Sequence, residues 1–264
     1  KKADEMAQQR AIFVAGCAKN SIDEKLAGEI FDTMEEFAKY GFNKSHSAAY
    51  ALVSYQTAWL KAHHPAGFMS AVLSADMQNT DKIVTLIDEC RRMRINVVPP
   101  HINTSTFKFD VNDAGHIVYG LGAIKGLGEG PIEAIVEARH SGAPFKDMFE
   151  FCKRVDLKKL NRRALEALIR AGAMDGMGPD RAVMMASLEE AMKAADQAAE
   201  NANAGMFDLF GTIEAQEERP PAWAKAPAWT PDEQLQGEKD TLGLYLTGHP
   251  IDQYEEELSH FTSC

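Results

Sequence analysis

Apolar residues recur every three or four positions through most of this chain, and that period predicts amphipathic helices. The pattern is clearest from residue 21 to 41, where large apolar side chains alternate with charged ones. Ser21 and Glu24 have the spacing of a capping box, so this helix is predicted to begin beside Ser21, and Gly41 is predicted to end it. Thr80 is likewise predicted to cap a later helix. Similar periodic runs predict helices at residues 47–65, 66–77, 80–93, 131–140, 161–173 and 179–200.

A different pattern interrupts the helices near the middle of the chain. The runs FKFDV (107–111) and HIVYGL (116–121) alternate apolar and polar residues, and they flank the sequence NDAG. A period of two on both sides of a short turn containing Asn and Gly is typical of a β-hairpin. The sequence therefore predicts a mainly α fold with a small β-hairpin.

Composition places the chain among globular proteins, with 45% hydrophobic and 25% charged residues. The four cysteines lie far apart and lack the paired spacing of a zinc site. No apolar run is long enough to span a membrane, so no membrane partner is expected. Because the sequence begins without Met and stops at Cys264 without an ending signal, we expect it to be a piece of a longer protein.

The net charge of −11 is distributed unevenly. Residues 189–264 contain sixteen Asp and Glu against four Lys and Arg, a net charge of −12. Residues 153–170, in contrast, carry seven basic side chains against two acidic ones, a local charge of +5. A phosphate group responds to local charge, so this basic segment favours a nucleic-acid partner although the whole chain is acidic.

The strongest local motif is LGAIKGLGEGPIEAIVEAR, residues 121–139. A helical turn, a Gly-x-Gly turn and a longer helix are typical of a helix-hairpin-helix. Glycine leaves the main chain uncovered, and the first N–H groups of a helix can be accepted by a phosphate oxygen. We therefore predict a sequence-independent contact with the DNA backbone; the alternative is an ordinary corner in which glycine only ends a helix. The predicted contact residues are Lys125, Gly126, Leu127, Gly128, Glu129 and Gly130.

The sequence also contains a weak echo of this motif. GMGPDRAVMMA, residues 176–186, again places a Gly-x-Gly turn immediately before a predicted helix. An echo of this length arises fairly often by chance, so it only suggests an internal repeat.

Two further segments carry candidate chemistry. FNKSH, residues 42–46, is a polar cluster between two predicted helices. Lys44 and His46 can meet an anion there, or Ser45 or Asn43 can simply cap the next helix. Residues 200–240 are rich in Ala, Pro, Glu and Gln and are predicted to be extended and mobile. Within them, MFDLF gathers large apolar side chains, which is unusual for a segment of this composition.

These motifs occur in the same order in a known family. The stretches YGFNKSHSAAYALVSYQTAWLKAHHP, NVVPPHINTS, IVYGLGAIKGLGEGPIEAIVEAR, KKLNRRALEALIRAGAMD and DTLGLYLTGHPIDQY closely resemble the replicative α subunits of bacterial DNA polymerase III, which are C-family DNA polymerases. The resemblance implies part of the helical fingers in residues 1–98 and a helix-hairpin-helix domain that binds duplex DNA in 99–200. It also implies a flexible segment with a clamp-binding motif in 201–240 and the start of the following region in 241–264.

The resemblance implies a role for each motif. Tyr40, Lys44 and His46 match positions near the incoming deoxynucleoside triphosphate. Residues 122–140 match the duplex-gripping helix-hairpin-helix, and four basic residues are expected on the same surface: Lys158, Lys159, Arg162 and Arg163. The sliding-clamp motif is matched by Met206, Phe207, Asp208, Leu209 and Phe210, with Met206 where Gln is typical. The resemblance implies that its apolar side chains are anchors for a groove of the clamp; the alternative is an apolar patch that folds back on the domain. Residues 203–207 are a poorer register.

The implied parent protein is a cytoplasmic DNA-directed DNA polymerase, a nucleotidyltransferase. No pair of aspartates able to hold the Mg²⁺ ions of a polymerase palm is found in this chain, so no cofactor and no activity are expected in this part alone. The implied partners are primer–template duplex DNA, deoxynucleoside triphosphates and the sliding clamp (β subunit), with other holoenzyme subunits bound through other regions. Alternatives are the error-prone or Gram-positive-type polymerases of the same family, a helix-hairpin-helix DNA glycosylase using Asp147 and Lys146, and a protein scaffold that does not touch DNA.

Overall fold

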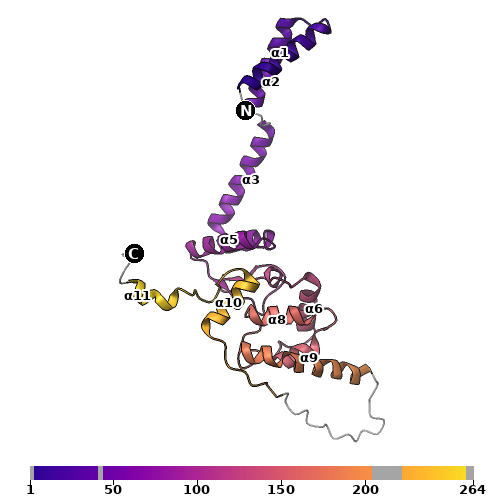
Figure 1. Cartoon of the computed structure of the whole chain (residues 1–264), viewed down its shortest axis with the longest axis vertical. Helices are drawn as coiled ribbons and strands as arrows, with labels where there is room; N and C mark the ends of the chain where they lie inside the picture. The colour runs from indigo at the N-terminus through magenta and orange to yellow at the C-terminus, as the bar shows by residue number, and fades with distance from the viewer. Residues whose placement is uncertain (1–2, 41–43, 204–221, 260–264) are drawn as a thin grey trace. The chain divides into compact units, whose positions relative to one another are not determined.

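The computed structural model describes residues 3–40, 44–203 and 222–259 (Figure 1). The chain folds as two compact units, Lys1–Leu60 and Lys61–Cys264. Helices dominate both units and one small sheet lies in the second, which confirms the predicted fold class. The unit boundary falls within a helix near residue 60, whereas the resemblance placed the end of the fingers part at residue 98.

The first unit contains α1 (Ala3–Lys19), α2 (Glu24–Tyr40) and most of α3 (Lys44–His63). The rings of Phe13 and Phe31 pack α1 against α2, with their centroids 5.6 Å apart. The predicted cap at Ser21 is wrong. The Asp23 carboxylate caps α2 by accepting the Leu26 N–H at 3.0 Å, while Ser21 has φ of 60° and lies in the preceding turn.

The second unit begins with two helices and the sheet. These elements are α4 (Pro65–Ala75), α5 (Thr80–Arg92), β1 (Val97–Val98), β2 (Asp110–Val111) and β3 (Ile117–Val118). β2 and β3 pair antiparallel, which confirms the predicted hairpin, and β1 adds to β3 in parallel to give the order β1-β3-β2. The cap of α5 is Asn79, which accepts the Lys82 N–H at 3.2 Å, and not Thr80 as predicted.

The core of the second unit lies among the helices that follow the sheet. These are the 3-10 turn η1 (Leu121–Ala123), α6 (Glu129–His140), α7 (Met148–Arg154), α8 (Arg162–Arg170) and α9 (Arg181–Asn203). α7 and α8 both pack against α9. Fully buried side chains such as Ile135, Phe151 and Leu168 fill the space between them. Each of these side chains contributes about 1.5–3 kcal/mol by leaving water.

The segment predicted to be extended contains a helix. α10 (Pro231–Leu242) begins with a capping box between Thr230 and Glu233 and ends at Gly243, whose φ is +81°. The segment before α10 contacts α9 at Ala224, whose N–H donates to the Ser187 hydroxyl at 2.9 Å. η2 (Asp252–Tyr254) and α11 (Glu255–Ser259) follow. The predicted clamp motif, residues 206–210, lies outside the described residues.

Candidate nucleic-acid interface

The predicted helix-hairpin-helix is formed by η1, a tight turn and α6. Gly126 lies in the turn with φ of +83°, a conformation that L side chains rarely adopt. The Leu127 N–H closes the turn by donating to the Ile124 carbonyl at 3.2 Å, and the Leu127 side chain is buried. Gly128 occupies the N-cap of α6, so no side chain there can satisfy the first N–H groups of the helix.

The main chain at the start of α6 is open. Within the part of the chain that the structure describes, the N–H groups of Gly128, Glu129 and Gly130 donate to no acceptor. A Cβ placed on Gly126 or Gly130 would meet no atom within 4 Å. A phosphate oxygen can therefore reach these N–H groups at the positive end of the helix dipole.

The turn is held in place by two segments that are distant from it in the sequence. The Lys125 N–H donates to the Thr241 carbonyl of α10 at 2.9 Å, and the Gln78 side-chain amide donates to the Gly122 carbonyl at 3.4 Å. The Lys125 side chain remains exposed, with no ion pair within the described ranges. Sequence reasoning missed Thr241 and Gln78 as positioning residues because both contacts join distant segments and leave no local pattern.

The internal echo is a second hairpin with the same geometry. Gly176 has φ of +81°, and the Met177 N–H donates to the Met174 carbonyl at 3.0 Å. Met174 and Met177 are buried, as Ile124 and Leu127 are in the first hairpin. The echo in the sequence therefore marks a structural repeat.

The second hairpin, however, is closed to a phosphate. The Asp180 carboxylate already caps α9 by accepting the Val183 N–H at 2.8 Å. The Trp223 ring and Met184 cover Gly178 so closely that a Cβ there would lie under 3 Å from both. Asp175 stands where the first hairpin has Lys125, and it pairs with Arg181 at 2.6 Å. Only the first hairpin offers open N–H groups beside a free positive charge.

The basic segment 153–170 is only partly available to an external anion. Lys158, Lys159 and Arg163 are exposed and make no ion pair among the described residues. Arg162 is exposed but pairs with Glu166 at 2.9 Å, an interaction that competes with a phosphate. Arg154 is used inside the fold, because its guanidinium donates to the carbonyls of Ala138 and Ala143 at 2.6 and 2.7 Å.

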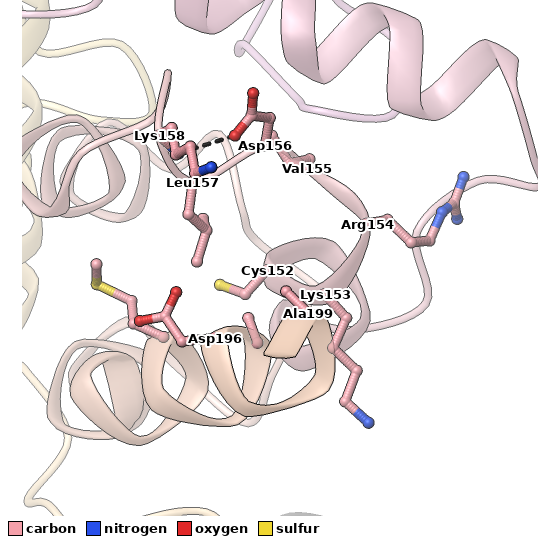
Figure 2. A pocket seen from close by; sticks show the side chains of 11 residues that line it. Cys152, Lys153, Arg154, Val155, Asp156, Leu157, Lys158, Asp196 and Ala199 are labelled. Carbon is pink, nitrogen blue, oxygen red and sulfur yellow. Dashed lines mark hydrogen bonds between the residues drawn. The ribbon is translucent and has the colours of Figure 1, made fainter. Parts of the chain in front are cut away.

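A cavity of about 420 Å³ lies beside this segment, between residues 152–158 and α9 (Figure 2). The side chains of Cys152 and Leu157 point into it, whereas those of Lys153 and Arg154 point away. Burial raises the pKa of the Cys152 thiol to about 12, so this thiol stays protonated and unreactive at neutral pH. Asp156, Lys158 and Asp196 also line the cavity, and the Asp196 carboxylate of α9 faces into it. Its lining is therefore mixed, and the cavity does not concentrate the basic charge of the segment.

The predicted nucleotide-binding residues lie in the first unit. Lys44 and His46 are exposed in the first turn of α3, and the His46 ring contacts the Tyr50 ring in a tilted arrangement, with 4.3 Å between the ring centroids. Two positions apart on a helix, Lys44 and His46 point to different sides, so α3 alone does not bring them to one point. Tyr40 is the last residue of α2, and its side chain lies outside the description.

The position of Asp147 does not favour the glycosylase alternative, because this carboxylate is used to cap a helix. The Asp147 carboxylate caps α7 by accepting the Glu150 N–H at 2.8 Å, and the Lys146 N–H donates to the Glu150 carboxylate at 2.9 Å. Among the residues described, no three His, Cys, Asp or Glu side chains converge as metal ligands. Nor do the described helices include one with the length and apolarity needed to cross a membrane.

Comparison with known proteins agrees with this geometry. Residues 94–184 match the family model of the helix-hairpin-helix motif. This range includes the glycine turns of both hairpins. The chain is 59% identical to the DNA polymerase III subunit alpha of Pseudomonas fluorescens over 99% of its length, and 57% identical to those of Vibrio cholerae and Escherichia coli K12 over 100% and 99%. The chain is homologous to a segment of the DNA polymerase III α subunits. It spans about a quarter of the length of these relatives, 23–24%.

Proposed function

We propose that this chain is the part of a replicative DNA polymerase III α subunit that grips duplex DNA and tethers the enzyme to a sliding clamp. The parent reaction is template-directed addition of deoxynucleotides with release of pyrophosphate. High identity to relatives of that name, over nearly the whole chain, supports this assignment. The Mg²⁺ ions that nucleotidyl transfer requires are assigned to the parent's palm, outside this chain.

The observation that carries the DNA-binding part is the open first hairpin. Its N–H groups at Gly128, Glu129 and Gly130 face a space that a phosphate can enter, and Lys125 supplies a charge beside them. Contacts of this kind hold the backbone and read no bases. Lys158, Lys159 and Arg163 extend the positive surface, with Arg162 joining once it leaves Glu166. Binding is therefore insensitive to sequence and weakens steeply with salt.

Two further roles belong to the same proposal. Tyr40, Lys44 and His46 contact the incoming deoxynucleoside triphosphate in the complete cytoplasmic polymerase. Met206, Phe207, Asp208, Leu209 and Phe210 bind the clamp as a short peptide whose Leu209 and Phe210 anchors fill a groove. Other holoenzyme subunits bind through regions of the parent that this chain does not contain.

A matched pair of variants tests the DNA-binding role. Gly126→Ala and Gly176→Ala each place a Cβ at positive φ with no atom within 4 Å, so both strain the fold by about 1 kcal/mol. Fluorescence anisotropy with a labelled blunt duplex is expected to show weaker binding for Gly126→Ala only. The logarithm of the wild-type affinity is expected to fall linearly with the logarithm of salt concentration. An equal loss of duplex affinity in both variants, or no binding by the wild type at low salt, would contradict the assignment of the first hairpin as the DNA contact.

Clamp tethering is tested separately by calorimetry with a purified bacterial sliding clamp. The wild-type chain is expected to bind, and the Leu209→Ala/Phe210→Ala variant is expected not to. If the wild-type chain released no heat at any clamp concentration, the proposed clamp binding would be wrong, whereas the DNA-binding proposal would stand.

A further inference from the structure

A groove of about 840 Å³ runs along the outer face of α6, opposite the loop that holds Thr106 and Phe107. Its floor is apolar, formed by the Phe107 ring together with Ile132 and Val136. Phe107 is fixed there because its ring packs against Gly122, where a Cβ would lie 2.8 Å from the ring. The floor is therefore a rigid surface, and Phe107 and Val136 remain partly exposed on it.

One rim of this groove is acidic. Glu129, Glu133 and Glu137 recur every four residues along α6, so their carboxylates form one row on the helix surface. All three are exposed, and none forms an ion pair within the described part of the chain. At 1.5 Å per residue the row is about 12 Å long. A partner that fits this groove therefore needs apolar side chains for the floor and positive charges at helical spacing for the carboxylates.

We propose that this groove docks a basic amphipathic helix of a partner protein. Lys or Arg side chains four residues apart on such a helix face the three carboxylates, and its apolar side chains cover Phe107, Ile132 and Val136. DNA is not the occupant, because its phosphates would face this row at close range and be repelled. Docking in the groove is argued from the groove alone, whereas its consequence for DNA rests on the proposed duplex-binding function.

The position of the groove gives such a partner a consequence for DNA. Glu129 belongs both to the acidic row and to the open first turn of α6. A cationic helix in the groove neutralises the charge nearest the phosphate site without covering the N–H groups of Gly128 and Gly130. The occupied groove therefore favours duplex binding at the first hairpin.

The test uses the whole chain and a short helical peptide with Leu and Lys in amphipathic order, and compares two double variants of equal charge change. Glu133→Lys/Glu137→Lys alters the rim, whereas Asp113→Lys/Glu200→Lys alters exposed carboxylates elsewhere on the second unit. Circular dichroism establishes that both variants fold. In anisotropy titrations the rim variant is expected to bind the peptide about tenfold more weakly than the wild type, and the control within about twofold.

Hydrogen exchange locates the bound peptide. Residues 104–108 and 129–141 are expected to gain protection when the Leu/Lys peptide binds, and not with a peptide in which Glu replaces Lys. Equal weakening in both double variants would show attraction to bulk negative charge and overturn the proposal. Absence of peptide binding, or protection of residues 104–108 and 133–141 by duplex DNA in place of the peptide, would overturn it as well; protection of residues 128–130 by DNA is expected from the first hairpin and does not count.

Discussion

Arg181 and Glu238, 57 residues apart in the sequence, form an ion pair with 3.2 Å between Nη1 and Oε1. Both side chains are buried, with exposures of 7% and 0%. Glu238 also accepts the main-chain N–H groups of Leu246 and Thr247, each at 3.0 Å. The pair therefore joins the start of α9 to α10 and to the segment that follows, and α10 in turn holds the first hairpin through Thr241.

Removing one member of this pair should destabilise the second unit strongly. Glu238→Ala leaves a buried guanidinium without one of its partners and two N–H groups without an acceptor, so we expect a loss of about 3–5 kcal/mol in the free energy of unfolding. Urea denaturation measures it. Asp240→Ala, on the exposed side of the same helix, is the control and should cost under about 1 kcal/mol. Similar losses in the two variants would contradict a structural role for the pair.

Most helices were predicted from the sequence because their hydrophobic period is local. Their first residues were harder to predict, because neighbouring residues compete to cap the same helix. Ser21 and Asp23 are both good caps, as are Thr80 and Asn79, and the structure uses the second of each pair. β1 has only two residues, too few to show a period. The capping box of Thr230 and Glu233 was present in the sequence, but the Pro- and Ala-rich surroundings favoured an extended segment instead.

The buried hydroxyl of Tyr119 should lower the free energy of unfolding. It finds no hydrogen-bond partner among the residues that the structure describes, and burial raises the pKa of this phenol. Tyr119→Phe removes the unsatisfied oxygen and keeps the ring, whose centroid lies 4.7 Å from that of Phe109. We expect the free energy of unfolding to rise by about 1 kcal/mol in urea titrations. Tyr245→Phe, at a half-buried position, should change it little; a clear loss in Tyr119→Phe would indicate a partner for the hydroxyl.

Glu150 should make stability depend on acid pH. The Lys146 N–H, and then the Arg154 guanidinium, hold the pKa of the Glu150 carboxyl below its ordinary value of 4.5. A lowered folded-state pKa gives stability that is present above the unfolded pKa and is lost as pH falls through the folded one. Urea midpoints of the wild type and Glu150→Gln should differ at neutral pH and converge as the pH falls below the lowered folded-state pKa. Glu137→Gln, an exposed control, should follow the wild type; a constant gap for Glu150→Gln would refute the linkage.

The candidate site was predictable only in part. Gly126, Gly128 and Gly130 were predicted from the Gly-x-Gly pattern, and the echo at Gly176 was visible as well. What separates the two hairpins is partly non-local. The carboxylate of Asp180 and the ring of Trp223 close the second, and no spacing rule joins Trp223 to Gly178 across 45 residues of sequence.

Gly130→Ala should raise the free energy of unfolding and weaken DNA binding at the same time. Gly130 lies in the first turn of α6, where Ala is a better helix former by roughly 0.5–1 kcal/mol and the added Cβ meets no protein atom within 4 Å. The same Cβ enters the space from which a phosphate would accept the N–H groups of Gly128 and Gly130. We expect a higher urea midpoint together with a duplex affinity lower by on the order of tenfold. Gly67→Ala is the control, because Gly67 lies early in α4 with the same open surroundings and should gain stability without loss of affinity. If Gly130→Ala bound duplex DNA as well as Gly67→Ala does, the backbone of the first hairpin would not be the phosphate site.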